Sequence, residues 1–142
     1  MSLNSAIDVA ATALSAQRLR MELASANMAN AETTRTPEGG PYKKRSAVFA
    51  AEPALLTTRE ERAGGAPGGV RVDQIVTDET PPALRYQPGH PDADAEGYVA
   101  YPNVNATAEM IDMLSAARSY EASISVIKTI RSLVTATLNL VR

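Results

Sequence analysis

The sequence has no cysteine, no tryptophan and only one histidine. The absence of cysteine excludes disulfide bonds, thiol nucleophiles and cysteine-based metal sites. Because His90 is the single histidine, neither a histidine-based zinc site nor a catalytic triad built on histidine can be assembled. No nucleophile elbow and no phosphate-cradling glycine loop is present. We therefore expect no catalytic, cofactor-binding or metal-binding residues, no enzymatic activity and no small-molecule substrate.

An excess of positive charge is also absent. The chain has 14 basic and 16 acidic residues, which gives a net charge of −2. Proteins that bind nucleic acids need clustered lysine and arginine to displace counterions from the phosphate backbone. We therefore expect no nucleic-acid partner. Aromatic residues are scarce as well, with five tyrosines and one phenylalanine, so a large aromatic core is not expected.

Long apolar runs are missing. The first thirty residues do not combine a basic start with a continuous apolar segment, as a secretory signal peptide would. No run approaches the ~20 apolar residues of a membrane-spanning helix. We expect a chain that is soluble, or that reaches its site by a route without signal cleavage.

Glycine and proline are absent from both ends of the chain. All eight glycines and all nine prolines lie between Pro37 and Pro102. Since these residues interrupt regular structure, the ends are predicted to be helical and the middle rich in loops. The predicted fold is mainly α with a small β insert. It divides into an N-terminal helix and hinge (1–36), a Pro/Gly-rich middle (37–102) and a long C-terminal helix (103–142).

Apolar residues recur at alternating steps of four and three at both ends, which is the spacing of a coiled-coil seam. The pattern predicts two long terminal helices that pair with each other and pack against other subunits. A second set of Ala6, Ala13, Ala16, Leu19 and Leu23 widens the first apolar face. The predicted subunit-packing residues are Leu3, Ile7, Ala10, Leu14, Met21, Ala24 and Met28, and then Met110, Met113, Ala117, Tyr120, Ile124, Ile127, Arg131, Val134, Leu138 and Val141.

Arg131 interrupts the second seam. One interpretation is that its stem packs on apolar neighbours while its charged group reaches water. The other is an ion pair with an acidic residue of another subunit, which would set the register of packing. The basic run Lys43–Arg45 likewise has two interpretations, a solvated surface or a contact with an acidic neighbouring subunit.

The middle of the chain predicts short strands. Residues 70–77 alternate apolar and polar side chains, and weaker strands are expected within 42–49, at 84–86 and at 98–101. The three strands at 70–77, 84–86 and 98–101 predict one small hairpin-like sheet. Residues 57–69 are polar and glycine-rich, which favours a flexible loop.

An acidic segment from His90 to Tyr98 imitates part of a calcium-binding loop. Asp92, Asp94, Glu96 and Gly97 match its positions 1, 3, 5 and 6, but position 12 is Asn103 and lacks the bidentate glutamate. A turn stabilised by side-chain caps is the favoured interpretation.

Three stretches carry a family resemblance. The first stretch, 25–44, begins with SANMANAETT (25–34), which resembles the ANxANxxT signature of bacterial flagellar rod and hook proteins. Its continuation 35–44 and the other two stretches, 92–105 and 109–122, resemble the proximal rod members of that family. The signature residues are Asn27, Asn30, Thr33, Thr34, Pro37, Gly39, Gly40, Asp92, Gly97, Tyr98, Pro102, Asn103 and Asn105.

The resemblance implies a structural subunit of the proximal rod, which transmits torque in the flagellar motor. It implies export by the flagellar type III apparatus without a cleaved signal, and assembly in the periplasm through the terminal helices. The implied partners are further copies of the chain, other rod proteins and the adaptor between the rod and the membrane ring. The apolar seams alone would also suit a soluble coiled-coil adaptor that binds a partner helix.

Overall fold

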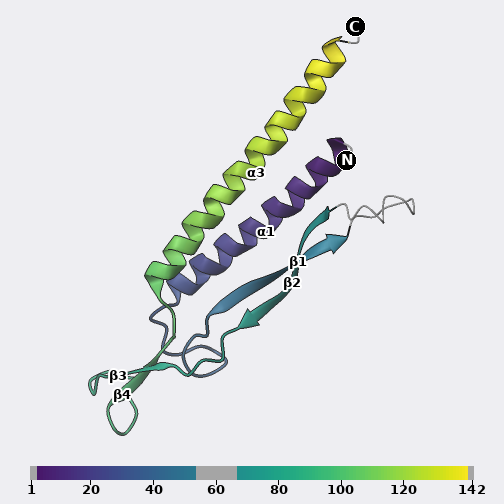
Figure 1. The fold of residues 1–142 in the computed structure, drawn as a ribbon. Helices are drawn as coiled ribbons and strands as arrows, with labels where there is room; N and C mark the ends of the chain where they lie inside the picture. The colour runs from purple at the N-terminus through teal and green to yellow at the C-terminus, as the bar shows by residue number, and fades with distance from the viewer. Residues whose placement is uncertain (1–2, 54–66, 141–142) are drawn as a thin grey trace.

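Two long helices dominate the computed structural model, which describes residues 3–53 and 67–140. Helix α1 (Leu3–Ala29) and helix α3 (Ala106–Leu140) lie side by side and run in opposite directions (Figure 1). Neither contains glycine or proline, so nothing in their sequences interrupts the helical hydrogen bonds. The predicted pair of terminal helices is confirmed. No helix among the described residues is both long enough and apolar enough to span a bilayer.

Alanine is prominent among the buried residues of the two helices. The buried apolar residues of α1 are Ala10, Ala16, Leu23 and Ala24, and those of α3 are Ala116 and Ile130. Helix α1 contacts both α3 and the strands β1 and β2, so its buried residues are covered from more than one side. Asn105 begins α3 as its N-cap, since its Oδ1 accepts hydrogen bonds from the backbone N–H groups of Thr107 and Ala108 at 3.0 and 3.2 Å.

The middle of the chain forms two separate antiparallel pairs of strands. Strands β1 (Arg45–Pro53) and β2 (Pro67–Thr77) form a hairpin that packs along α1, whereas β3 (Ala83–Tyr86) pairs with β4 (Tyr98–Tyr101) beyond the end of the helices (Figure 1). The prediction of one small sheet was therefore wrong. Pro81 and Pro82 lie between β2 and β3, and two successive prolines cannot donate the hydrogen bonds that would continue a strand.

The first hairpin is longer than the sequence suggested. β1 extends to Pro53, and β2 begins at Pro67, so residues 67–69 of the expected loop belong to a strand. The rest of the expected loop falls within residues 57–66, which lie outside the described residues.

A bulge in β2 changes which residues of the hairpin share a face. Val48 pairs with Gln74 but Phe49 pairs with Val72, so Asp73 has no direct partner. This extra residue shifts the alternation by one position. As a result Val72 and Ile75 share the face that carries Phe49 and Ala47. Of these residues, Ala47 and Phe49 line the groove beside α1, whereas Val72 and Ile75 are exposed.

Candidate assembly surface and its polar junction

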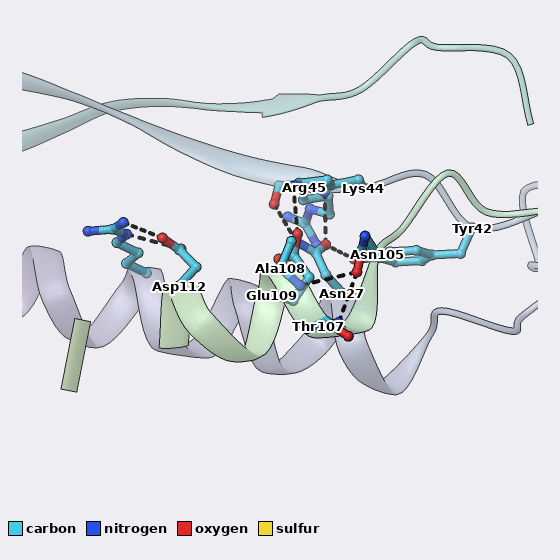
Figure 2. A network of polar contacts seen from close by, with 10 residues as sticks. Asn27, Tyr42, Lys44, Arg45, Asn105, Thr107, Ala108, Glu109 and Asp112 are labelled. Carbon is cyan, nitrogen blue, oxygen red and sulfur yellow. Dashed lines mark hydrogen bonds and ion pairs between the residues drawn. The ribbon is translucent and has the colours of Figure 1, made fainter. Parts of the chain in front are cut away.

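A buried asparagine joins the two helices to the first strand. Asn27 is 1% exposed, and its side-chain amide makes four hydrogen bonds, each 2.9 Å long (Figure 2). Its Nδ2 donates to the carbonyl oxygen of Arg45 and to Oε2 of Glu109, and its Oδ1 accepts from the Arg45 N–H and the Tyr42 hydroxyl. The full hydrogen-bonding capacity of the amide is therefore used. We call Asn27, Tyr42, Lys44, Arg45 and Glu109 the polar junction.

Asn27 acts as a substitute strand neighbour. The amide bonds both the N–H and the C=O of Arg45, which is the first residue of β1. A paired β-strand would present the same donor and acceptor to that residue. The side chain therefore fixes where β1 begins and ties it to the end of α1.

Glu109 contributes the only described buried carboxylate of the junction. Glu109 is 4% exposed. Its Oε1 lies 2.5 Å from the Lys44 ammonium, and its Oε2 accepts a hydrogen bond from the Asn27 side chain. A buried charge is stable only when it is paired and hydrogen-bonded, and both conditions are met here. Burial raises the pKa of the Tyr42 hydroxyl, Arg45 lowers it and Glu109 raises it, so the phenol stays protonated and donates to Asn27.

A second charged pair extends the junction along the helices. Arg20 of α1 binds Asp112 of α3 through two contacts, of which the Nε–Oδ2 distance is 3.0 Å. These groups line a groove of about 290 Å³ between α1, β1 and the first turns of α3. Lys43 pairs with Glu79 and Lys44 with Glu109. Both lysines of the basic run therefore have partners within the chain. Lys43 and Arg45 are exposed, as the solvated-surface interpretation expects, and Lys44 is half-buried. A contact of the run with a neighbouring subunit stays a prediction.

The signature residues that follow α1 form an ordered turn. Asn30 donates to the carbonyl of Ala26 at 2.9 Å, and the Thr33 hydroxyl donates to Asn30 Oδ1 at 3.2 Å. Gly39 and Gly40 have φ angles of 92° and 74°, a left-handed conformation that favours glycine. Pro37 lies exposed in the same turn.

Thr34 links this turn to the acidic segment. Its hydroxyl donates to Asp92 Oδ2 at 2.8 Å, and Asp92 also lies 3.7 Å from the Arg35 guanidinium. Asp94 Oδ1 accepts from the backbone N–H groups of Glu96 and Tyr98, which confirms a side-chain-capped turn. Within the described part of the chain, no group of three or more acidic, histidine or cysteine residues is placed to hold a metal ion.

The remaining signature residues surround β4. Gly97 has a φ of 85°, and a Cβ there would lie 2.9 Å from the Tyr86 ring. Tyr98 packs edge-on against Tyr86, with ring centroids 5.4 Å apart. Pro102 is buried and Asn103 is exposed. The structure thus brings all the signature residues to one end of the helix pair, around the turns that connect it to the strands.

The predicted packing residues have mixed exposure within the single chain. Among those of α1 whose side chains are described, Ala10 and Ala24 are buried and Ile7, Leu14, Met21 and Met28 are half-buried. In α3 the half-buried members are Met113, Ala117, Tyr120, Ile124, Ile127 and Val134, while Met110, Arg131 and Leu138 are exposed. Leu3 lies in α1 and Val141 lies outside the described residues. Which of these residues contact other subunits stays a prediction.

The face of α3 that packs on α1 is offset from the predicted seam. The buried residues Glu109, Ala116 and Ile130 each lie next to a predicted position and not on one. Met110, which the pattern placed on the seam, is 49% exposed. Glu109 points inward, where it accepts a hydrogen bond from Asn27, and Met110, the next residue, lies about 100° further around the helix.

The rest of α3 presents a surface suited to contact with other helices. Large apolar side chains lie exposed along its length, namely Met110, Ile111, Leu114, Val126, Leu133 and Leu138. Five hydroxyls of the helix, those of Ser119, Ser123, Thr129, Thr135 and Thr137, donate to carbonyls of the same helix. These five groups would keep their hydrogen bonds if the surface were buried.

Comparison with known proteins identifies the family. A family model described as flagella basal body rod protein matches residues 7–35, and one described as flagellar basal body rod FlgEFG protein C-terminal matches residues 95–140. The flagellar basal-body rod protein FlgC of Yersinia enterocolitica is 46% identical over 142 residues, which cover 99% of this chain and 98% of that protein. The chain belongs to the FlgC family of flagellar rod proteins.

Other FlgC proteins resemble the chain to a similar degree. That of Borreliella burgdorferi is 43% identical over 94% of this chain and 93% of its own length, and that of Bacillus subtilis is 39% identical over 84% and 85%. The chain is thus a structural rod subunit and not an enzyme. The alternative of a soluble adaptor is set aside by these matches.

Sequence reasoning missed the centre of the junction. In the sequence, Glu109 lies within a predicted helix and Lys44 within a basic run, and neither position carries a signal of burial. No periodic signal marks a buried polar residue, because its partners come from distant parts of the chain. The asparagine of the family signature was the one available indication.

Proposed function

We propose that this FlgC-family chain assembles with further copies of itself through α1 and α3 to form the proximal part of the rod. The observation that carries the proposal is the amount of surface left uncovered. The chain exposes 10023 Å², whereas a compact monomer of 15.0 kDa would expose roughly 7,000 Å². The surplus on this one chain, about 3,000 Å², is on the order of what one partner contributes to four standard interfaces, at about 800 Å² each.

The chemistry of α3 supports burial of that surplus. Its exposed apolar residues and internally satisfied hydroxyls suit a dry contact between helices. The hairpin and the β3–β4 pair lie outside the helix pair, so in such an assembly they form the outer part. Closely packed helices deform little, and an array of them would transmit torque.

The further partners follow from membership of the family. We propose that the chain contacts other rod proteins and the adaptor between the rod and the membrane ring. We also propose that it passes through the flagellar type III export apparatus without cleavage and joins the rod in the periplasm. These assignments rest on the resemblance of residues 25–44 and 92–122 to proximal rod proteins.

Electron microscopy of cells that lack this gene tests the proposal. We expect membrane-ring structures without rod, hook or filament, and complete flagella when the gene is restored. Intact flagella in the deletion strain would refute the role in the rod. An incomplete structure that retains the proximal rod would move the subunit to a later position in the assembly.

A further inference from the structure

The edge of β1 that does not pair with β2 presents backbone groups to its surroundings. Asn27 bonds both the N–H and the C=O of Arg45, so those two groups face away from β2 (Figure 2). Backbone groups alternate in direction along a strand of an antiparallel pair. Ala47 and Phe49 therefore present their N–H and C=O groups at this outer edge, and Ser46 between them bonds β2.

Two further contacts agree with this alternation. The Asp78 N–H donates to the carbonyl of Lys44 at 2.8 Å, so the residue before β1 faces β2. The Val70 N–H lies opposite Ala51 and donates to the Thr12 hydroxyl, so it faces away from β1. Alternate residues of β1, beginning with the first, thus turn their backbone groups outward.

A groove lies beside this outer edge. The groove of about 290 Å³ between α1, β1 and α3, here named the junction groove, is lined by Ala47 and Phe49. Its helical walls are apolar at Leu23, Ala24 and Ala108. Among the described residues, no hydrogen bond is formed by the outward backbone groups of Ala47 and Phe49. A free edge of this kind accepts an additional strand from another chain.

One charged residue of the groove has no charged partner. Among the residues that line it, Arg20 pairs with Asp112 and Lys44 pairs with Glu109. Arg45 is exposed, and its side chain takes part in none of the ion pairs or hydrogen bonds found within the described ranges. The groove therefore has one uncompensated positive charge, at the end where β1 begins.

Asn27 closes that same end of the groove. Its amide already occupies the position of a strand neighbour beside Arg45, so an added strand starts or stops next to Ala47. A strand that runs antiparallel to β1 has its own C-terminus at this end. If it stops beside Ala47, its terminal carboxylate accepts from the Ala47 N–H and lies within reach of the Arg45 guanidinium.

We propose that the junction groove binds the free C-terminus of a partner protein as an added antiparallel strand. The terminal residue pairs with Ala47, and the residue two before it pairs with Phe49, over about 7 Å of strand. The carboxylate is neutralised by Arg45. Side chains at the two paired positions lie on the same face as Ala47 and Phe49, beside the apolar wall, so small apolar residues are favoured there.

The partner is a different protein and not a copy of this chain. Helix α3 runs from the groove to Leu140 at the far end of the helix pair, so the chain does not fill its own groove (Figure 1). The last residue of the sequence is Arg142, whose positive charge would be repelled by Arg45. The contact does not depend on the proposed assembly through the terminal helices.

Synthetic peptides with a free C-terminus test the proposal. Fluorescent peptides that vary at their last three positions are each mixed with the full chain, and binding is measured by fluorescence anisotropy. We expect binding by peptides with small apolar residues at the last and third-last positions. Amidation of the best peptide should weaken its binding roughly tenfold or more, because the charge-assisted contacts of the carboxylate are lost.

Methylation of the peptide backbone separates strand pairing from charge attraction. A methyl group on the last amide nitrogen should weaken binding roughly tenfold, because that N–H donates to the Ala47 carbonyl. A methyl group on the preceding amide nitrogen is the matched control. It should change binding little, because that N–H faces away from β1.

Variants of the protein give a second readout. Arg45→Gln should weaken binding of the acid peptide roughly tenfold and leave the amide unaffected. Lys43→Gln should affect neither peptide, because Lys43 is exposed and lies outside the groove. Ala47→Pro removes the outward N–H and should abolish binding. Proline is tolerated where a strand N–H faces outward, and circular dichroism checks that the fold is kept.

The outcomes decide between the C-terminal contact and its alternatives. If no peptide binds, the proposal is wrong. Equal binding of the acid and the amide would show that the groove takes an internal segment, which would also refute it. Binding that survives both Arg45→Gln and methylation of the last amide would place the peptide on another surface. None of these results would alter the role of the chain in the rod.

Discussion

At the scale of single residues, Asn27 explains why an amide is needed at the junction. Its side chain donates to two acceptors and accepts from two donors, and those partners belong to three segments of the chain. An aspartate has the same shape but no donor. It would place negative charge against Glu109 and the Arg45 carbonyl.

Replacement of Asn27 tests this role. Asn27→Ala should lower the free energy of unfolding by about 2–3 kcal/mol, because it leaves several buried polar groups without partners. Asn27→Asp should cost more, through repulsion with Glu109. Urea unfolding followed by tyrosine fluorescence is suitable, since Tyr42 lies in the junction. The exposed Asn103→Ala is the control, and an equal effect of both alanine variants would contradict the assignment.

Gly69 is required for the contact between β2 and α1. It has a φ of 130°, and a Cβ at this position would lie 2.5 Å from Thr12 Oγ1, which accepts from the Val70 N–H at 3.1 Å. Gly69→Ala should therefore destabilise the fold by about 2–4 kcal/mol, from backbone strain and steric overlap together.

A second glycine separates the two causes. Gly39 also has a positive φ, of 92°, but a Cβ there meets no atom within 4 Å. Gly39→Ala should thus cost only the strain, about 1–2 kcal/mol. Thermal unfolding of both variants would measure the difference, and indistinguishable melting temperatures would show that the close approach to Thr12 is unimportant.

At the scale of elements, both terminal helices were predictable because they lack glycine and proline and repeat apolar residues at helical spacing. The face on which they pair was less predictable. Apolar residues cover more than one side of α3, so the period leaves neighbouring faces nearly equivalent. The contact between Asn27 and Glu109 selects one of them, and no local pattern marks that contact.

A charge on a helix face tests the role of the elements in assembly. Ile124→Asp and Leu14→Asp should each block incorporation into the rod, because an unpaired charge in a dry helix contact is strongly unfavourable. Motility and the presence of the chain in isolated basal bodies measure the effect. Ser125→Asp is the neighbouring control, since Ser125 is exposed. Normal motility in both variants would mean that these positions are not buried in the rod.

The middle elements were predicted in part. Residues 70–77, 84–86 and 98–101 lie in strands as expected, but their arrangement in two separate pairs was not foreseen. The bulge at Asp73 was also not predicted. Simple alternation along the strand would place Val70, Val72 and Gln74 on one face, with no extra residue at Asp73. The division of the chain into the regions 1–36, 37–102 and 103–142 stays a prediction. The set of signature residues came from the resemblance.

At the scale of the whole molecule, the chain resembles part of a larger structure more than a closed globule. Few of its described side chains are fully buried, and much of α3 is exposed. The junction end has polar and apolar contacts, whereas the C-terminal end of α3 has neither. Helical segments without tertiary contacts are marginal in water.

The dilute protein should consequently be only partly helical. The 27 residues of α1 and the 35 of α3 together make 62 of 142 residues. Circular dichroism at low concentration should give a lower helix content than this, which rises as the chain assembles. A sharp melt from full helicity that does not depend on concentration would contradict the expectation.

The sequence by itself determined the helical ends, the interrupted middle, the family resemblance and the absence of catalytic chemistry. Each of these depends on residue type and local spacing, which a linear pattern records. Only the tertiary structure decided which face of α3 meets α1, how the strands pair, and where Asn27 and Glu109 meet. These features depend on contacts between residues far apart in the chain, and the free energy of such contacts is defined only once the backbone has brought them together.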